Sequence, residues 1–324
     1  MSPVRAPSAV RTMRRDRDHQ AGLVVVHPPA PGESRSIAVL LRLPTSVTEA
    51  QECLAEGAVP IGGATLVWAT WQRDGFPERA VSLRGVPEAT VVEADSLGGA
   101  VVLHRVDDRV PEVLRRAAAS VGTGAVRRTA TVGGNIVGST LRCLLPAALV
   151  LDARPTVLAQ DRAYETDLAE LLAKRHLLLG LRWRTPLASG YRKEPAEAGG
   201  PPPLVVATAV REGPGGEREL RVAVREGYDV VGGAAPCEEG ADQALDALAR
   251  TDVGALPAAA RDVVRGQVRD VLAGGPRPPR PPRRGARGRG GRRGGGAARR
   301  PLRAPCGSRW PGAIHSGFLS PKPL

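Results

Sequence analysis

The stretch Arg127-Arg-Thr-Ala-Thr-Val-Gly-Gly-Asn-Ile136 is the most informative part of this 324-residue chain. Its pair Gly133 and Gly134 lets backbone approach a ligand closely, because neither residue has a side chain. Thr131 adds a hydroxyl donor, and Asn135 can both donate and accept hydrogen bonds. The stretch therefore predicts a polar ligand held against a tight glycine turn.

A second glycine loop stands earlier in the chain and consists of Ile61, Gly62, Gly63, Ala64, Thr65 and Leu66. Consecutive backbone amides in such a turn form a concave anion site, for which a pyrophosphate is the usual guest. We expect each loop to follow a buried strand, so that the two loops grip a long dinucleotide from both sides. Neither loop matches the glycine patterns of Rossmann domains or P-loops.

The surrounding pattern predicts an α+β fold. Before and after the first loop we expect strands at 37–43, 59–61, 80–83, 90–93 and 100–104. Ser46 and Glu49 form a capping box for a helix that ends at Gly57. Further helices are expected at 111–122 and 144–151. Strands at 204–210 and 220–224, joined by a hairpin and covered on one face by helices at 241–250 and 257–272, complete a small antiparallel C-terminal domain.

The net charge of +13 is concentrated at one end of the chain. Residues 274–324 hold 13 of the 46 Lys and Arg residues and no Asp or Glu, so the remainder balances 33 basic against 33 acidic side chains. The four cysteines, Cys53, Cys143, Cys237 and Cys306, lie far apart without ligand spacing. We therefore expect no metal or iron–sulfur site, no membrane span, and reduced thiols in the cytoplasm.

The two loops together resemble the FAD-binding subunit of the molybdenum hydroxylases, the family of xanthine and carbon monoxide dehydrogenases. Members typically show A-G-G-T-[DN]-L followed later by R-x-x-A-T-[IV]-G-G-N-[IL]. Residues 61–66 keep the two glycines and the leucine of the first pattern, and residues 127–136 follow the second. The resemblance covers roughly residues 37–240. It implies a two-part FAD-binding domain of the vanillyl-alcohol-oxidase-like type, and FAD as the cofactor.

The resemblance also implies roles for individual residues. Residues 61–66 would hold the pyrophosphate, while Thr131, Gly133, Gly134 and Asn135 would line the other side of FAD. Lys193 would approach the isoalloxazine ring. No catalytic acid or base is required of the chain. Trp68 and Trp71 follow the first loop and could flank the cofactor, but residues of this kind are more often core or interface, and we leave them outside the predicted site.

The same resemblance implies two partner polypeptides, a molybdopterin-binding large subunit and a small subunit with [2Fe–2S] clusters. The chain would pass electrons from those clusters to an external acceptor. We divide it into a basic, disordered leader (1–36), an FAD-binding domain (37–172), a C-terminal domain (173–273) and a disordered tail rich in Arg, Gly and Pro (274–324).

Three departures from the family pattern change a polar side chain. Ala64 stands where the family has Thr, and Thr65 stands where it has Asp or Asn. Leu144 stands where members often have an acidic residue. The loss of such a ribose or adenine contact typically weakens binding by about 1–3 kcal/mol.

Two alternatives remain open from the sequence. The chain could be a stand-alone FAD-dependent reductase or oxidase, which keeps the fold and removes the partners. In a different class, the Arg/Gly tail could bind nucleic acid through phosphates and base stacking.

We predict that removing residues 274–324 leaves the FAD content and the melting temperature nearly unchanged, because the tail has little apolar surface to bury. The isoelectric point should fall towards neutrality, and salt-sensitive retention on a cation exchanger should disappear. Melting temperature and flavin stoichiometry of the full-length and 1–273 proteins test this. A large loss of either on truncation would show that the tail docks on the folded part.

Overall fold

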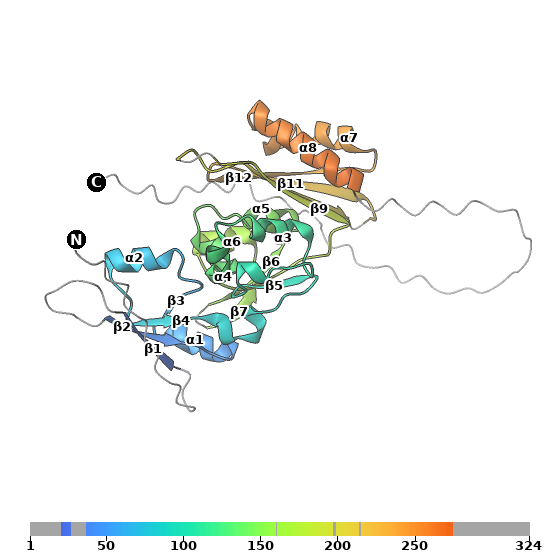
Figure 1. Ribbon diagram of the computed structural model, residues 1–324. Coiled ribbons are helices and arrows are strands. Elements are labelled where there is room, and N and C mark those ends of the chain that lie inside the picture. The colour runs from blue at the N-terminus through green and yellow to red at the C-terminus, as the bar shows by residue number, and fades with distance from the viewer. Residues whose placement is uncertain (1–20, 27–36, 160, 197–198, 214, 275–324) are drawn as a thin grey trace, which may run out of the picture.

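The computed structural model describes residues 21–26, 37–159, 161–196, 199–213 and 215–274, and it contains three four-stranded sheets (Figure 1). Most of the predicted leader and the tail beyond Gly274 lie outside the described residues. Within the predicted disordered leader, however, Ala21–Val26 forms strand β1, which pairs antiparallel with β2 (Ile37–Arg42). That part of the prediction is wrong. The mixed helix and sheet content confirms the predicted α+β class.

The first sheet has the strand order β1-β2-β4-β3, and it contains a parallel unit formed by β2, β3 (Val59–Pro60) and β4 (Arg79–Val81). Helix α1 (Val47–Ala55) joins β2 to β3, and helix α2 (Val67–Asp74) joins β3 to β4. The expected cap of α1 is present, since the Ser46 hydroxyl accepts from the Glu49 amide at 3.1 Å. The Glu49 carboxylate reaches back to the Thr45 amide at 2.7 Å, one residue earlier than a standard capping box.

The second sheet is antiparallel, with the order β5-β8-β6-β7. Its strands are β5 (Ser96–Gly98), β6 (Arg154–Leu158), β7 (Ala163–Glu165) and β8 (Leu177–Arg182). The helices of this part of the chain are α3 (Glu112–Ala119), α4 (Gly124–Thr129), α5 (Leu145–Val150) and α6 (Leu168–Lys174). Because β8 pairs with β5 and β6, this sheet extends past the predicted boundary at residue 172.

The third sheet, ordered β12-β11-β10-β9, is also antiparallel and has helices on both faces (Figure 1). Its strands are β9 (Ala188–Lys193), β10 (Val205–Glu212), β11 (Arg218–Glu226) and β12 (Asp229–Pro236). Helices α7 (Ala241–Leu248) and α8 (Ala258–Gly274) cover one face, as predicted, and α3 and α5 pack on the other. Along β10, Val206 and Val210 join the outer core, while Val205 and Ala207 join the central one. This explains why the strand is apolar without alternation.

Three of the predicted strands differ from the structure. Residues 90–93 form no strand, and only Val92 makes an isolated bridge. In place of a strand at 100–104, Val102 bridges to Thr131 and Leu103–Arg105 forms a 3₁₀ turn, because the two segments meet at a single bridge. The strand at 59–60 exists but lies at a sheet edge, with Val59 38% exposed, so it is not buried as expected.

A buried charge network joins the central part of the chain to the third sheet. The Asp152 carboxylate at the end of α5 lies 2.9 Å from the Arg221 guanidinium and 3.2 Å from that of Arg211. Burial alone would raise the pKa of Asp152, but the two guanidinium groups outweigh it and lower that pKa. The Arg221 side chain is almost entirely buried.

We predict that Asp152→Asn destabilises the fold by about 1–2 kcal/mol at neutral pH, since it removes one anion from the buried Arg221. The loss is smaller than for a fully buried pair because the Asp152 side chain is 37% exposed and Glu219 still pairs with Arg221. The folded-state pKa is lowered, so this stabilisation is complete above the unfolded-state value and is lost as the pH falls through the folded-state value.

Urea unfolding of the wild type and Asp152→Asn from neutral to acidic pH measures this difference. Asp246→Asn, on an exposed position of α7, is the matched control and should change stability little at any pH. A difference between wild type and Asp152→Asn that grows on acidification would contradict the assignment.

Candidate functional site

The first glycine loop presents a series of unpaired backbone donors. It leaves the edge strand β3, where the Ile61 amide donates to the Val81 carbonyl at 2.8 Å. Ala64 has φ 57°, a left-handed conformation that turns the chain, and its carbonyl accepts from the Trp68 amide at 3.1 Å. The amides of residues 62–66 have no hydrogen-bond partner among the described residues. Such consecutive free amides are the donors that an anion requires.

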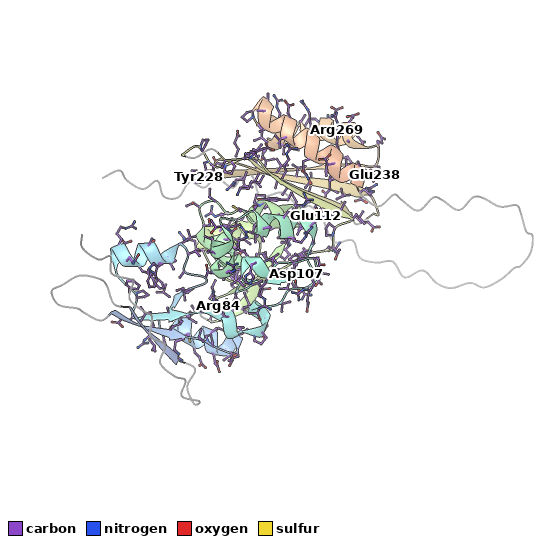
Figure 2. The ribbon with its side chains drawn as sticks, in the orientation of Figure 1. Arg84, Asp107, Glu112, Tyr228, Glu238 and Arg269 are labelled. Atoms are coloured by element: carbon purple, nitrogen blue, oxygen red, sulfur yellow. The ribbon has the colours of Figure 1, made fainter. Side chains whose placement is uncertain are left out.

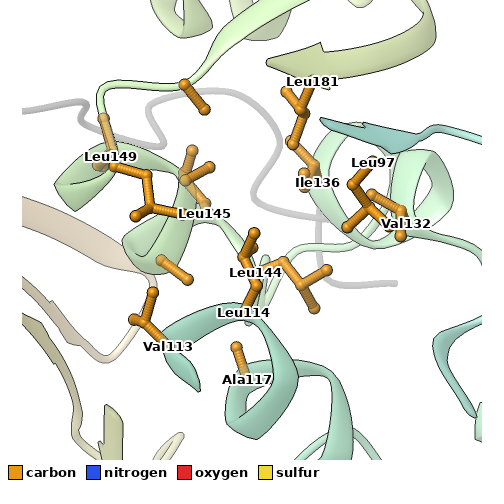
Figure 3. Close-up of a cluster of buried hydrophobic side chains, with 14 of the residues drawn as sticks. Leu97, Val113, Leu114, Ala117, Val132, Ile136, Leu144, Leu145, Leu149 and Leu181 are labelled. Atoms are coloured by element: carbon orange, nitrogen blue, oxygen red, sulfur yellow. The ribbon is translucent and has the colours of Figure 1, made fainter. Parts of the chain in front are cut away.

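The second loop follows helix α4 and not a buried strand, contrary to our expectation. Its amides are already used within the protein. Val132 donates to the Val101 carbonyl at 2.9 Å, Gly133 to the Gly99 carbonyl at 2.8 Å, and Gly134 to the Thr131 hydroxyl at 3.1 Å. The loop therefore forms a rigid wall, and its flanking residues Val132 and Ile136 are buried in the central core (Figure 3).

The two loops touch each other through their backbones. A Cβ on Gly63 would overlap the Thr129 carbonyl, and a Cβ on Gly62 would overlap the Thr131 hydroxyl. Arg84, which Figure 2 labels, also donates to the Thr129 carbonyl at 3.3 Å. The structure thus brings together two segments that the sequence separates, and it does so where only glycine fits.

Thr131 and Asn135 both point largely into the protein. The Thr131 side chain is buried, and its hydroxyl accepts a hydrogen bond from the Gly134 amide. The Asn135 Oδ1 accepts from the buried Leu144 amide at 2.9 Å, while no described residue accepts from its Nδ2. The Leu144 side chain is itself fully buried, so this departure from the family pattern contributes to the core.

Lys193 lies away from both loops, on β9. Its Nζ donates to the Ser120 carbonyl at the end of α3, at 2.8 Å. The neighbouring Tyr191 hydroxyl lies 3.1 Å from the Ser120 hydroxyl, and burial raises the pKa of Tyr191 to about 12. The structure therefore brings the predicted site residues of the two loops into contact with each other. Lys193 makes no described contact with either loop.

Sequence reasoning missed several residues that support the site. Gly98 and Gly99 pass so close to other backbone that a Cβ on either would overlap a carbonyl oxygen, and Gly99 holds the second loop. In the sequence, the adjacent glycines Gly98 and Gly99 were the signal that could have indicated this close backbone contact. The fully buried Arg225 donates to the carbonyls of Leu141 and Pro203, both at 2.8 Å. No local signal in the sequence distinguishes Arg225 from a surface arginine.

The family model of the FAD binding domain in molybdopterin dehydrogenase matches residues 37–178. This segment is an FAD-binding domain of that family. FAD is accordingly its cofactor, and the resemblance predicted from the two glycine loops is confirmed. The geometry fits this cofactor, because the free amides of residues 62–66 suit a pyrophosphate with two negative charges.

Solved structures of oxidoreductases share the fold at low sequence identity. Quinoline 2-oxidoreductase from Pseudomonas putida 86 aligns over 73% of this chain and 96% of its own, with 18% identity and a TM-score of 0.53. CO dehydrogenase from Oligotropha carboxidovorans aligns over 76% and 98%, with 18% identity and a TM-score of 0.54. No curated protein matches the sequence.

The described residues contain no group of three or more His, Cys, Asp or Glu side chains arranged to hold a metal ion. None of the helices in these ranges is long and apolar enough to cross a bilayer.

We predict that Asn135→Ala destabilises the FAD-binding domain by about 1–3 kcal/mol, because it leaves the buried Leu144 amide without an acceptor. Asn135→Asp is the matched variant, since it places a carboxylate oxygen where the Asn135 amide oxygen lies, and it should lose less stability when that carboxyl is protonated at acidic pH than when it is ionised. Chemical unfolding of the flavin-free proteins measures both. Equal stability of Asn135→Ala and the wild type would show that this bond contributes nothing.

Proposed function

We propose that this chain is the FAD-binding, electron-transferring subunit of a molybdenum-hydroxylase-type oxidoreductase. The single observation that carries the proposal is the pair of glycine loops in direct contact, one of which presents free amides, inside an FAD-binding domain of the molybdopterin dehydrogenase family. When bound, FAD supplies the redox chemistry, and the protein supplies binding and orientation.

In this proposal each part of the site has a separate task. The amides of residues 62–66 hold the pyrophosphate, and the surface of Gly133 and Gly134 bounds the other side of the cofactor. Lys193 faces the isoalloxazine from β9, where its bond to Ser120 fixes the position of its ammonium group. A fixed positive charge near the ring favours the reduced, anionic flavin.

The partners in the proposal are a molybdopterin-binding large subunit and a small subunit with [2Fe–2S] clusters, in the cytoplasm. The family assignment of residues 37–178 supports such partners. Another solved structure with the same fold, at 17% identity and a TM-score of 0.54, is a Cu,Mo-CO dehydrogenase. Electrons would enter from the iron–sulfur clusters of the partner and leave to an external acceptor.

We predict that the purified full-length protein carries FAD that heat or acid releases, because no covalent attachment is expected. Gly63→Val should abolish FAD binding, since its Cβ would overlap the Thr129 carbonyl and push the loops apart. Gly134→Val should weaken or abolish it as well, because its Cβ would lie 3.0 Å from the Thr131 hydroxyl. Visible absorption and released FAD per chain give the measurement.

Gly124→Val is the matched control, because among the described residues no atom outside its own helix backbone and chain neighbours lies within 4 Å of a Cβ built on Gly124. It should retain its flavin. Circular dichroism of each variant separates loss of binding from loss of fold. Full flavin content in both loop variants, or a folded wild type that fails to bind added FAD, would refute the proposed cofactor site.

A further inference from the structure

Helix α2 carries an aromatic cluster that stays at the protein surface. The rings of Trp68 and Phe76 pack edge to face with centroids 5.3 Å apart, and those of Trp71 and Phe76 lie 6.1 Å apart. No residue of α2 is buried, and Trp68 is 37% exposed. Of the two interpretations, core or interface, the structure therefore excludes the core for Trp68 and Trp71. Exposed apolar surface of this kind commonly marks a binding site.

The cluster adjoins the first glycine loop directly. Trp68 stands in the first turn of α2, just beyond the free amides of residues 62–66, and its own amide is tied to the Ala64 carbonyl. Leu66, the last residue with a free amide in this loop, is 49% exposed. One continuous segment thus presents anion donors and then, within about one helical turn of 5.4 Å, an aromatic surface.

The direction of the bound cofactor follows from the positions of α2 and β9. The pyrophosphate of FAD joins an isoalloxazine half to an adenosine half. Lys193, assigned to the isoalloxazine, lies on β9, and Figure 1 shows α2 and β9 on different sides of α4. With the isoalloxazine placed at Lys193, as proposed above, the adenosine half would leave the first loop on the side of α2.

We propose that the indole of Trp68 stacks on the adenine of FAD, an inference that rests on the proposed cofactor site. Aromatic side chains bind nucleobases by stacking without regard to base identity, because every base has a π-face. Edge-to-face packing on Phe76 restricts the indole, and Trp68 is still 37% exposed. The adenine contact would offset the Thr hydroxyl and the Asp or Asn side chain that the family pattern has where this loop has Ala64 and Thr65.

Titration of the flavin-free, full-length protein with FAD, ADP and FMN tests the proposal. ADP contains the pyrophosphate and adenine without a flavin, whereas FMN lacks adenine. ADP should quench tryptophan emission of the wild type by contact. Trp68→Ala should bind FAD and ADP about tenfold more weakly, equivalent to about 1.4 kcal/mol, with unchanged FMN affinity.

Two further variants make the readout specific. Trp68→Phe keeps a ring but removes one of the four tryptophans, so it should retain most of the affinity while most of the ADP-dependent quenching disappears. Tyr228→Ala is the control for loss of an exposed aromatic residue. Tyr228 is 53% exposed in the turn between β11 and β12, and Figure 2 shows it at the end of the third sheet, apart from α2.

The outcomes separate this inference from the proposed function. FAD binding to wild type and Trp68→Ala with equal affinity would overturn the adenine contact and leave the cofactor site intact. A loss of FMN affinity as large as that of ADP would also overturn it, because Trp68 would then act on the flavin half or on the fold. A wild type that binds none of the three ligands would overturn both proposals.

Discussion

The backbone contact between the two glycine loops is the constraint on which the rest of the site depends. Gly62 and Gly63 lie against Thr129 and Thr131 with no room for a Cβ. Through this contact the first sheet is held against the central part of the chain. The same contact leaves the loops with different tasks. The amides of the second loop donate hydrogen bonds within the protein, whereas those of the first loop have no partner in the described part of the chain and can bind an anion.

The surrounding structure supports this contact from two directions. The Gly99 carbonyl accepts from the Gly133 amide of the second loop. The Asn135 side chain accepts from the Leu144 amide and so connects this loop to the start of α5. From the third sheet, the buried Arg225 guanidinium holds Leu141 and Pro203, and Asp152 pairs with Arg211 and Arg221. Residues that bind a cofactor are placed accurately when such supporting bonds fix the backbone behind them.

The elements predicted well from the sequence have strong local signals. The cap of α1, the buried face of α3 and the strands on either side of residues 213–216 follow from side-chain chemistry and apolar spacing within a few residues. Residues 90–93 and 100–104 have the same β-branched, apolar composition as a strand. They form isolated bridges and a 3₁₀ turn because they cross neighbouring segments at single points. Composition does not distinguish a buried crossing from a paired strand.

The sequence by itself determined the two glycine loops and, through their motifs, the FAD-binding family, because turn chemistry and close backbone approach depend on residues adjacent in the chain. Only the tertiary structure decided where the side chains around those loops point. It turned Thr131 and Asn135 inward, placed Lys193 on the end of α3 and left Trp68 at the surface. The orientation of each of these side chains depends on which residues, often distant in sequence, pack against it. The local sequence pattern does not indicate such contacts.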